Sequence, residues 1–388
     1  MLPIAGMKKK VLILVFSNLK TDARVMRQIE SLKDEYDLTV VCLDINPTED
    51  YQAIVLPRHK LTFFRKALSA VFLLSKAFFK AHSILYPYQA FLDRSFKDEH
   101  FDLIIANDVE TLPLAFRFKG PQTRIMLDAH EYAPLHFENK FWWRVFFQDF
   151  NTFLCKKYIP LLDGMTTIGS GLAKAYEHNF GKKPVVITNA TYYHDLSPKF
   201  SDSPVIRIVH HGIVNRSRKI ELIIQMMDYL PENFTLDLVL VVPAFAYQAK
   251  AYFAELKENS RNKRVTFRDA VPIHQIIELL REYDMGVILA PPINFNYANG
   301  LPNKLFDYIQ ARLAVLTGPT PEIANIVRTY NLGVVADGFT PEEMARNVAI
   351  LSREQINLLK ERSDAAAKEY NAEKNRIILN DYIRSILA

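Results

Sequence analysis

The chain has 388 residues, of which 49% are hydrophobic and 23% charged, so it is expected to fold as two or three domains and not as one small disulfide-stapled module. Its 48 basic and 43 acidic residues leave a net charge of +5, too small to indicate nucleic-acid binding. Cys42 and Cys155, the two cysteines, provide neither a disulfide framework nor a cysteine metal site. The apolar run 11–16 is too short for a secretory signal, and no run is long enough to span a membrane. We therefore expect a cytoplasmic protein.

The first half alternates short apolar runs with helical patterns. Continuous apolar runs are typical of strands in a parallel sheet that is covered on both faces. The expected strands are 11–16, 38–43, 103–106, 125–128, 165–168 and 185–188. Residues 189–204 follow, a polar segment without periodicity that indicates a linker.

The same alternation restarts after the linker. The expected strands of this half are 206–214, 236–242, 265–268, 285–289, 314–317 and 333–336. Two βα-repeating halves predict an α/β fold of two doubly wound, Rossmann-like domains that face each other across a cleft. We expect an N-terminal domain at 1–190 and a second domain at 204–365, with ligands at the carboxyl ends of the strands.

Several common cofactor motifs are missing from the sequence. It has no P-loop and no complete G-x-G-x-x-G, and His130-Glu131 lacks a second histidine four residues after the first. No two aspartates stand two apart, so a D-x-D metal clamp is excluded. We expect no metal and no cofactor, and any bound diphosphate must be neutralised by basic side chains and helix dipoles.

The stretch 294–320 carries the strongest chemical signal. Pro302 is expected at the first position of a helix, where backbone amides and the positive helix end can face a phosphate. Lys304 and Asp307 lie three apart on one face of that helix, so a cation and a carboxylate stand near its start. This pattern suits the diphosphate and the ribose of a nucleotide.

Residues 299–308 read NGLPNKLFDY, which resembles the G-x-P-N-K-L-F-E-Y variant of the retaining GT-B glycosyltransferases of family 4. The resemblance implies that Asp307 binds the ribose, Lys304 contacts the diphosphate and Asn299 holds the donor sugar. Asn299 and Asp307 stand where the family's E-x(7)-E signature has its two glutamates. The remaining donor-binding residues implied by the resemblance are Gly212, Gly300, Leu301 and Asn303.

A basic loop, 209–219, follows the first strand of the second half. In the family the corresponding loop holds an arginine and a lysine that clamp the diphosphate. Arg218 stands at the lysine position and Ile213 at the arginine position, so Arg216 or Lys219 would supply the second charge. A solvated basic loop is the alternative.

The segment 127–134 follows an expected strand and is similar to the D-x-H-E segment of the same family. The resemblance implies that His130 touches the donor sugar near the reacting carbon and that Glu131 orients it. Asp108 and Asp22 match positions that face the acceptor.

The family resemblance covers nearly the whole chain. It implies a helix at 366–388 that crosses back to the N-terminal domain. It also implies sugar transfer with retained configuration, without a metal or a carboxylate nucleophile, and catalytic roles for His130, Lys304 and Arg218.

Residues 51–92 contain no Asp or Glu, and Arg65, Lys76 and Lys80 fall on one side of a predicted amphipathic helix at 61–80. Two interpretations stay open: adsorption to an anionic membrane surface, or a domain helix with a solvated basic face. The aromatic cluster 141–147 is either a second contact or core.

Three hypotheses follow from the sequence. The leading one is a cytoplasmic glycosyltransferase, peripheral at the inner membrane face, that moves a sugar from a nucleotide diphosphate sugar to a glycan or lipid-linked acceptor in cell-surface polysaccharide synthesis. The others are a GT-B-fold sugar-nucleotide epimerase and a catalytically decayed donor-binding protein. The missing first glutamate and the missing loop arginine motivate the last.

Overall fold

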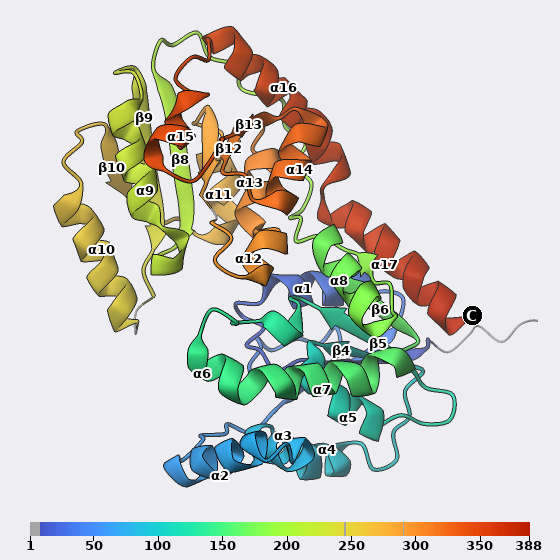
Figure 1. The fold of residues 1–388 in the computed structure, drawn as a ribbon. Helices are drawn as coiled ribbons and strands as arrows, with labels where there is room; N and C mark the ends of the chain where they lie inside the picture. The colour runs from blue at the N-terminus through green and yellow to red at the C-terminus, as the bar shows by residue number, and fades with distance from the viewer. Residues whose placement is uncertain (1–7, 244–245, 290) are drawn as a thin grey trace, which may run out of the picture. The chain divides into compact units, whose positions relative to one another are not determined.

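The computed structural model describes residues 8–243, 246–289 and 291–388 (Figure 1). The chain divides into two compact units, each with its own sheet and core. Unit 1 comprises Met1–Ile187, Asn294–Asn296 and Arg376–Ala388, and unit 2 comprises Thr188–Ile293 and Tyr297–Asn375.

Unit 1 contains a seven-stranded parallel sheet in the order β3-β2-β1-β4-β5-β6-β7. Its strands are β1 (Lys10–Leu14), β2 (Asp37–Cys42), β3 (Gln52–Val55), β4 (Leu103–Asn107), β5 (Arg124–Ala129), β6 (Gly164–Thr167) and β7 (Val185–Val186). Its longer helices are α1 (Ala23–Leu32), α2 (Phe63–Leu74), α3 (Phe78–Leu85), α4 (Gln89–Ser95), α5 (Leu112–Arg117), α7 (Asp149–Tyr158) and α8 (Ser170–Phe180). Short helical segments are η1 (Val109–Thr111), η2 (Ala133–Leu135), α6 (Phe141–Trp143), the π-helical η3 (Arg144–Gln148) and η4 (Ile159–Leu161).

Unit 2 contains a six-stranded parallel sheet in the order β10-β9-β8-β11-β12-β13. Its strands are β8 (Ile206–Ile213), β9 (Phe234–Val241), β10 (Val265–Arg268), β11 (Met285–Ile288), β12 (Ala314–Thr317) and β13 (Gly333–Val335). Its longer helices are α9 (Ile220–Met226), α10 (Tyr247–Asn259), α11 (Ile276–Leu280), α13 (Asn303–Gln310), α14 (Pro321–Tyr330), α15 (Pro341–Arg346) and α16 (Arg353–Glu369). Short turns are η5 (Arg216–Arg218), η6 (Met227–Tyr229) and η7 (Ile273–Gln275), and the helices α12 (Phe295–Asn299) and α17 (Ala372–Leu387) each contain residues of both units.

Alternating side chains of each central strand enter two different cores, which is why the strands are apolar throughout. In β1, Leu12 and Leu14 pack on the face covered by the helices between α3 and α8, and Val11 and Ile13 pack on the opposite face. Burial on both faces thus explains the continuous apolar runs, and it confirms the predicted doubly wound architecture.

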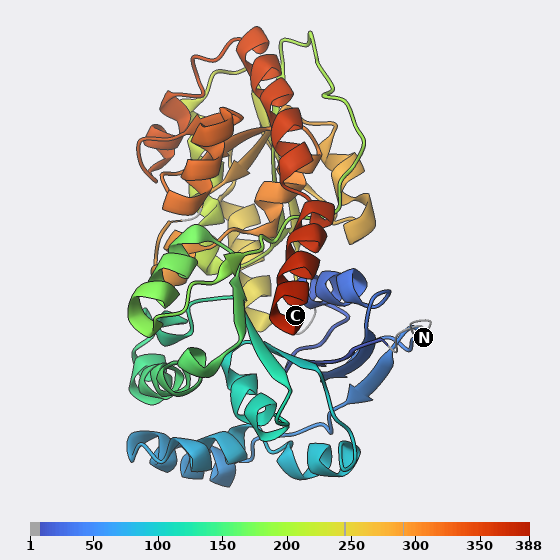
Figure 2. The same ribbon diagram turned by 90° about the vertical axis from the view of Figure 1, so that its right-hand side faces the viewer.

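The C-terminal part of α17 covers the second face of the sheet in unit 1. Its Leu379 and Ile383 join the core that contains α1. Arg384 forms an ion pair with Glu35, just beyond α1, at 2.8 Å, and Figure 2 shows the two helices beside each other.

The twelve predicted strands all occur, with ends that differ by at most two residues. The sequence analysis missed β3, which is a short edge strand paired only with β2 and largely exposed. Within the described residues, no helix combines the length and the apolar character needed to cross a bilayer.

The prediction of one amphipathic helix over 61–80 is wrong in its extent. Lys76 adopts a left-handed backbone with φ 58°, which separates α2 from α3. Within α2, Ser69 and Leu73 are buried, while Phe64 and Leu68 of the apolar side are exposed.

Candidate functional site

A cluster of basic and histidine side chains in unit 2 lies where β8 ends and α13 begins. Lys304, in the first turn of α13, is only 5% exposed, although its side chain carries an ammonium group. Its Nζ donates a hydrogen bond to Nε2 of His210, in β8, at 3.2 Å. Burial lowers the pKa of this lysine, whereas the charge of Asp307, three residues further along α13, raises it.

The tautomer of His210 follows from its second contact. Its Nδ1 lies 2.9 Å from the backbone oxygen of Val287, which can only accept, so the proton sits on Nδ1. The lone pair of Nε2 is then free to accept from Lys304. Burial, followed by the charge of Lys304, lowers the pKa of His210 well below its usual range, so the ring is neutral.

The neighbouring His211 contacts the same helix. Its Nε2 lies 3.5 Å from a carboxylate oxygen of Asp307 without a hydrogen bond, and its ring packs against Tyr308. Burial first, and then Lys304 and Arg218, lower the pKa of His211 to about 3. Both histidines are therefore uncharged at neutral pH, and the basic side chains of this cluster are Lys304 and Arg218.

Arg218 is the second cation of this cluster. It ends the short turn η5, which begins after Asn215 caps Ser217. Its Nε is buried without a hydrogen-bond partner. Burial lowers the pKa of Lys304 most, and the charge of Arg218 lowers it further. The two basic side chains therefore repel each other.

Gly212 shapes the backbone next to these cations. Its φ of 129° is a conformation that residues with a Cβ rarely adopt. A Cβ placed there would lie 3.5 Å from Nζ of Lys304, so the strand end passes directly beside the ammonium. Gly212, Lys304, Arg218 and Asp307, four of the predicted donor residues, are thus brought to one place.

The other predicted donor residues lie nearby in sequence but have different surroundings. Asn299 ends α12, and Leu301 is buried in the core while its backbone oxygen accepts from Asn189. Pro302 caps α13, which begins at Asn303, one residue later than predicted. Gly300 lies in the turn between the two helices.

Arg216 and Lys219 point to other partners. Arg216 is exposed, forms an ion pair with Glu255 of α10 and stacks on the ring of Tyr252 at 4.6 Å. Lys219 lies 3.9 Å from Glu221. The role of Arg216 in donor binding stays a prediction that requires it to leave Glu255.

A second cluster, in unit 1, surrounds His130 directly after β5. Its Nε2 donates to Asn107 at 3.2 Å and lies 3.5 Å from Asp128, while its Nδ1 lies 3.4 Å from Asp108. Burial alone would lower the pKa of His130, but Asp108 and Asp128 together raise it to about 9. This ring is therefore an imidazolium at neutral pH.

Asp128 is the buried anchor of the cluster. Arg24, in α1, pairs with both of its oxygens, at 2.5 and 3.1 Å, and Thr166 donates to it at 2.8 Å. Burial disfavours this carboxylate, yet Arg24 and His130 hold its pKa well below the usual range. Asp22, which was predicted to face the sugar acceptor, caps α1. Its side chain accepts a hydrogen bond from the backbone amide of Val25.

The sequence analysis assigned Glu131 to His130, but the structure pairs it with His136, at 2.6 Å. Asp108 is the residue that contacts His130, through its side chain and by accepting from the backbone amide at 3.0 Å. Glu110 was missed. Burial, followed by the charge of Asp108, raises its pKa to about 7. The acidic pair 108 and 110, directly after β4, was the available signal.

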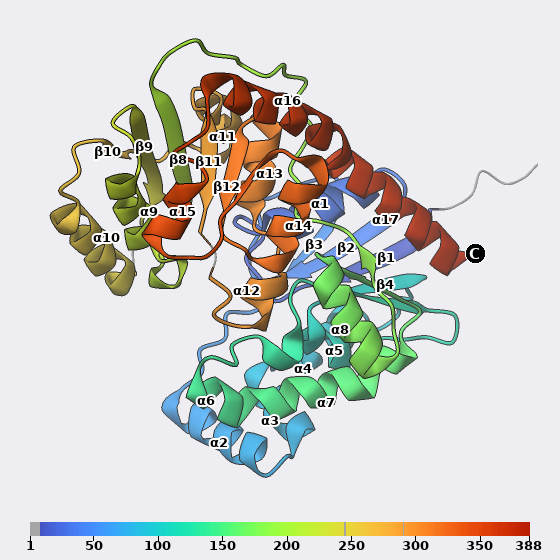
Figure 3. The same ribbon diagram turned by 45° about the horizontal axis from the view of Figure 1, so that its top comes forward.

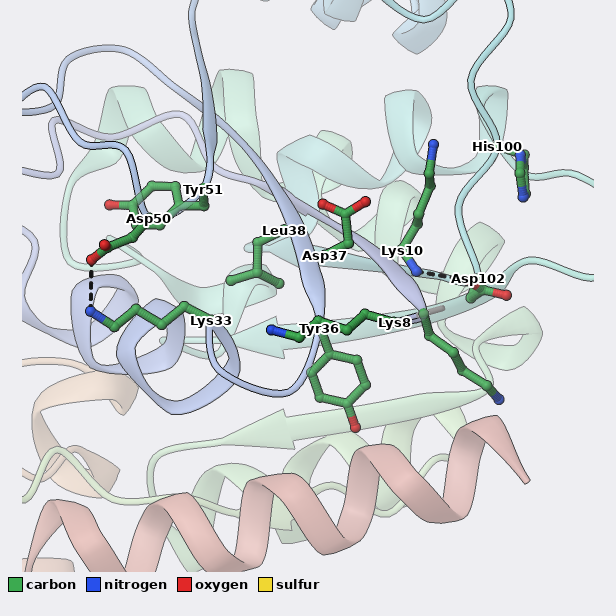
Figure 4. A pocket seen from close by; sticks show the side chains of 11 residues that line it. Lys8, Lys10, Lys33, Tyr36, Asp37, Leu38, Asp50, Tyr51, His100 and Asp102 are labelled. Carbon is green, nitrogen blue, oxygen red and sulfur yellow. Dashed lines mark hydrogen bonds and ion pairs between the residues drawn. The ribbon is translucent and has the colours of Figure 1, made fainter. Parts of the chain in front are cut away.

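A cavity of about 570 Å³ lies elsewhere in unit 1, at the amino ends of β1 and β2 (Figure 4). Its lysines alternate with carboxylates: Lys33 pairs with Asp50 at 2.8 Å, and the backbone amide of Lys10 donates to Asp102. Because both basic and acidic side chains line the cavity, its charge does not favour an anionic ligand. Among the described residues, no group of three or more His, Cys, Asp or Glu side chains is arranged to hold a metal ion.

Comparisons with known proteins identify the fold. No family model and no curated protein sequence matches the chain. Sucrose-phosphate synthase from Thermosynechococcus elongatus has a similar structure, with a TM-score of 0.73 and 12% identity over 98% of this chain and 99% of that one. HepE from Anabaena, solved with UDP-glucose, has a TM-score of 0.69 and 14% identity over 97% and 100%.

A third similar structure is WaaG, a glycosyltransferase involved in lipopolysaccharide biosynthesis. Its TM-score is 0.64, with 14% identity over 95% of this chain and 99% of WaaG. All three cover nearly the full length of both chains, and the two parallel sheets of seven and six strands match their architecture. The chain therefore has the GT-B fold of two Rossmann-like domains.

Proposed function

We propose that the protein is a glycosyltransferase that moves a sugar from a nucleoside diphosphate sugar to a glycan or lipid-linked acceptor. The observation that carries this proposal is Lys304, a buried cation whose ammonium donates to a neutral histidine and lies near a second cation, Arg218. The diphosphate of such a donor carries one negative charge on each phosphate and would pair with these two basic side chains. Among similar structures, HepE was solved with UDP-glucose, which supports this class of donor.

The two cations would act mainly during the reaction. When the sugar leaves the donor, negative charge grows on the diphosphate, and preorganised cations in a dry site stabilise that charge more than they stabilise the ground state. We assign this role to Lys304 and Arg218. Gly212 lets the backbone approach the phosphate without a side chain in between.

The remaining predicted residues keep their roles within the proposal. Asp307 binds the ribose hydroxyls, and the donor sugar is held by Asn299, His130 and the amides of the turn at residues 300–303. Asp108, Glu131 and Asp22 face the acceptor. Retention of configuration, independence of metals, membership of family 4 and a place in cell-surface polysaccharide synthesis at the cytoplasmic membrane face complete the proposal.

The first experiment is a thermal-shift screen of the purified protein with UDP, GDP, ADP and their sugar conjugates. A ligand that binds only the folded state raises the melting temperature by mass action. We expect one nucleotide family to stabilise the protein and Asp307→Ala to lose this shift. Asp228→Ala, which removes an exposed carboxylate in η6, is the matched control and keeps it. No shift with any nucleotide at millimolar concentration contradicts the proposal.

Turnover then separates the proposed enzyme from the two alternatives. A transferase consumes the donor only when an acceptor is supplied and forms a new glycoside. An epimerase consumes the donor alone, and a decayed protein binds nucleotide without consuming any.

A further inference from the structure

Unit 1 exposes an apolar surface made by two separate segments of the chain. We call it the aromatic patch, and it consists of Phe63, Phe64, Leu68, Val71, Phe141 and Trp142. Phe64 is 84% exposed and Trp142 is 68% exposed, values that are unusual for side chains of this size. Large exposed apolar patches on a folded protein mark sites of interaction.

The two segments form one surface. The helix α2 packs against η3, and η3 continues from α6, which contains Phe141 and Trp142. Figures 1 and 3 both show α6 beside α2 in unit 1. Lys76, at the end of α2, also forms an ion pair with Asp149, at the start of α7, at 2.9 Å.

The orientation of α2 shows that the aromatic patch is not part of the core of unit 1. Inward-facing positions of α2 hold Ser69 and Leu73, and Ser69 donates to the backbone of Lys66. The wider apolar side, with Phe64 and Leu68, faces away from unit 1. A helix that turns its apolar side outward needs a partner for it.

The charge around the patch selects the partner. Six exposed cations flank it: Arg65, Lys66, Lys76, Lys80, Lys140 and Arg144. No acidic residue occurs between positions 51 and 92 or between 140 and 148. Two of the cations lie over aromatic rings, Lys80 over Phe72 at 5.6 Å and Arg144 over Phe141 at 6.0 Å. Aromatic side chains ringed by cations match the interface of an anionic bilayer.

We propose that the aromatic patch of α2, α6 and η3 is a membrane-docking surface, on which Phe63, Phe64 and Trp142 insert between lipids while the flanking cations bind anionic headgroups. Neither segment suffices alone. The inference gives the proposed enzyme a defined lipid contact, but it stands on surface residues and is tested without a sugar donor.

The protein reports on this surface by itself, because both of its tryptophans, Trp142 and Trp143, lie in α6. We expect vesicles of phosphatidylcholine with about 30% phosphatidylglycerol to shift the tryptophan emission to shorter wavelengths. Brominated lipids should quench it, and Trp142→Phe should lose most of the change. An unchanged spectrum with the intact protein overturns the proposal.

Flotation with the same vesicles tests the two components separately. Each cation near an anionic surface is worth about fivefold in partitioning, so Arg65→Glu, Lys66→Glu and Lys80→Glu together should reduce binding by more than a hundredfold. Replacing Phe64 and Trp142 by Ser should reduce it at least tenfold at unchanged charge. The first variant tests the flanking cations, and the second tests the aromatic side chains of the patch.

The control carries the same charge change at exposed lysines of unit 2: Lys250→Glu, Lys257→Glu and Lys263→Glu. It should keep at least a third of the wild-type binding, and equal loss in both triple variants overturns the assignment of the patch. Equal binding to vesicles of pure phosphatidylcholine would contradict the role of the cations. Concentration-dependent dimerisation that Phe64→Ser and Trp142→Ser abolish, without vesicle binding, would assign the patch to a second copy of the chain instead.

Discussion

The clusters of unit 1 and unit 2 differ in their electrostatics, although each contains a histidine near the carboxyl end of a parallel strand. In unit 2, His210 lies near the carboxyl end of β8, and in unit 1, His130 follows the carboxyl end of β5. Lys304 and burial keep His210 neutral, whereas Asp108 and Asp128 raise the pKa of His130 to about 9. Histidines near the carboxyl ends of two parallel strands therefore differ in charge. His210 is a neutral hydrogen-bond acceptor, whereas His130 is a cation.

The difference lies in which charge each cluster leaves unbalanced. Around Lys304 the excess is positive, so the cluster is suited to receive an anion. Around His130, the cations Arg24 and His130 face the carboxylates of Asp108 and Asp128, so this cluster is balanced by its own residues. The cluster around Lys304 is therefore suited to bind a ligand, whereas the ion pairs around His130 stabilise the arrangement of their own side chains.

The largest expected effect comes from Lys304→Met, which keeps the length of the side chain and removes the charge. Transfer should fall by a factor of about 1,000 or more, because the developing charge loses a buried donor. The melting temperature of the ligand-free protein should stay equal or rise, because a buried cation costs desolvation energy. Initial rates and calorimetry check both. Lys250→Met is the control, and a wild-type rate in Lys304→Met removes this residue from the reaction.

Arg218 and Arg216 belong to the same turn but differ in their surroundings, so they form a matched pair. Arg218→Ala should reduce transfer about 100-fold, since its half-buried side chain places a positive charge near Lys304. Arg216→Ala should change it less than about threefold, because an exposed ion pair with Glu255 contributes little. Steady-state kinetics measures the two ratios. The reverse order would mean that Arg216 leaves Glu255 and takes over the phosphate.

His130 should make stability depend on pH in the alkaline range. Its pKa is raised on folding, so the stabilisation is complete below pH 6.5 and is lost as the pH rises through about 9. The loss amounts to at most about 3 kcal/mol. Urea unfolding between pH 8 and 10 measures the slope in a range where Glu110, with its pKa of about 7, is already largely ionised.

His130→Gln is the variant for this prediction and should flatten the slope. NMR titration of the imidazole checks the assignment directly. A His130 resonance that titrates near pH 6.5 would contradict the acidic character of the cluster.

The smallest effect concerns the hydrogen bond between His210 and Lys304. His210→Phe should destabilise the protein by about 1–3 kcal/mol, because the ammonium loses its acceptor while it stays buried. In the double variant with Lys304→Met this loss should largely disappear. A double-mutant cycle by urea unfolding measures the coupling, and purely additive effects would show that the bond contributes nothing.

The sequence predicts the strands well because burial on both faces leaves continuous apolar runs, as in β1 and β12. It predicts β3 poorly, since an exposed edge strand needs only its pairing with β2. Helix periodicity divides α2 into two sides, but it does not say which side turns inward. That choice depends on the neighbours of Ser69 and Leu73, which are distant in sequence.

The sequence likewise predicts the residues of the candidate site but not their contacts. Lys304 and Asp307 are found from their spacing on one helix, and Arg218 from its place in a loop after a strand. The pairing of Lys304 with His210, 94 residues away, follows from where β8 ends and not from any local pattern. Glu131 was assigned to its sequence neighbour His130, although its partner is His136, because sequence distance does not give side-chain direction.

The position of α17 has a consequence for the order in which the protein is made. Leu379 and Ile383 complete a core of unit 1, and the hydroxyl of Tyr382 accepts from the backbone of Met165. A ribosome synthesises all of unit 2 before these residues emerge. The part of one sheet face that α1 does not cover therefore stays exposed through most of translation, and a fragment that stops at residue 190 would leave that part exposed.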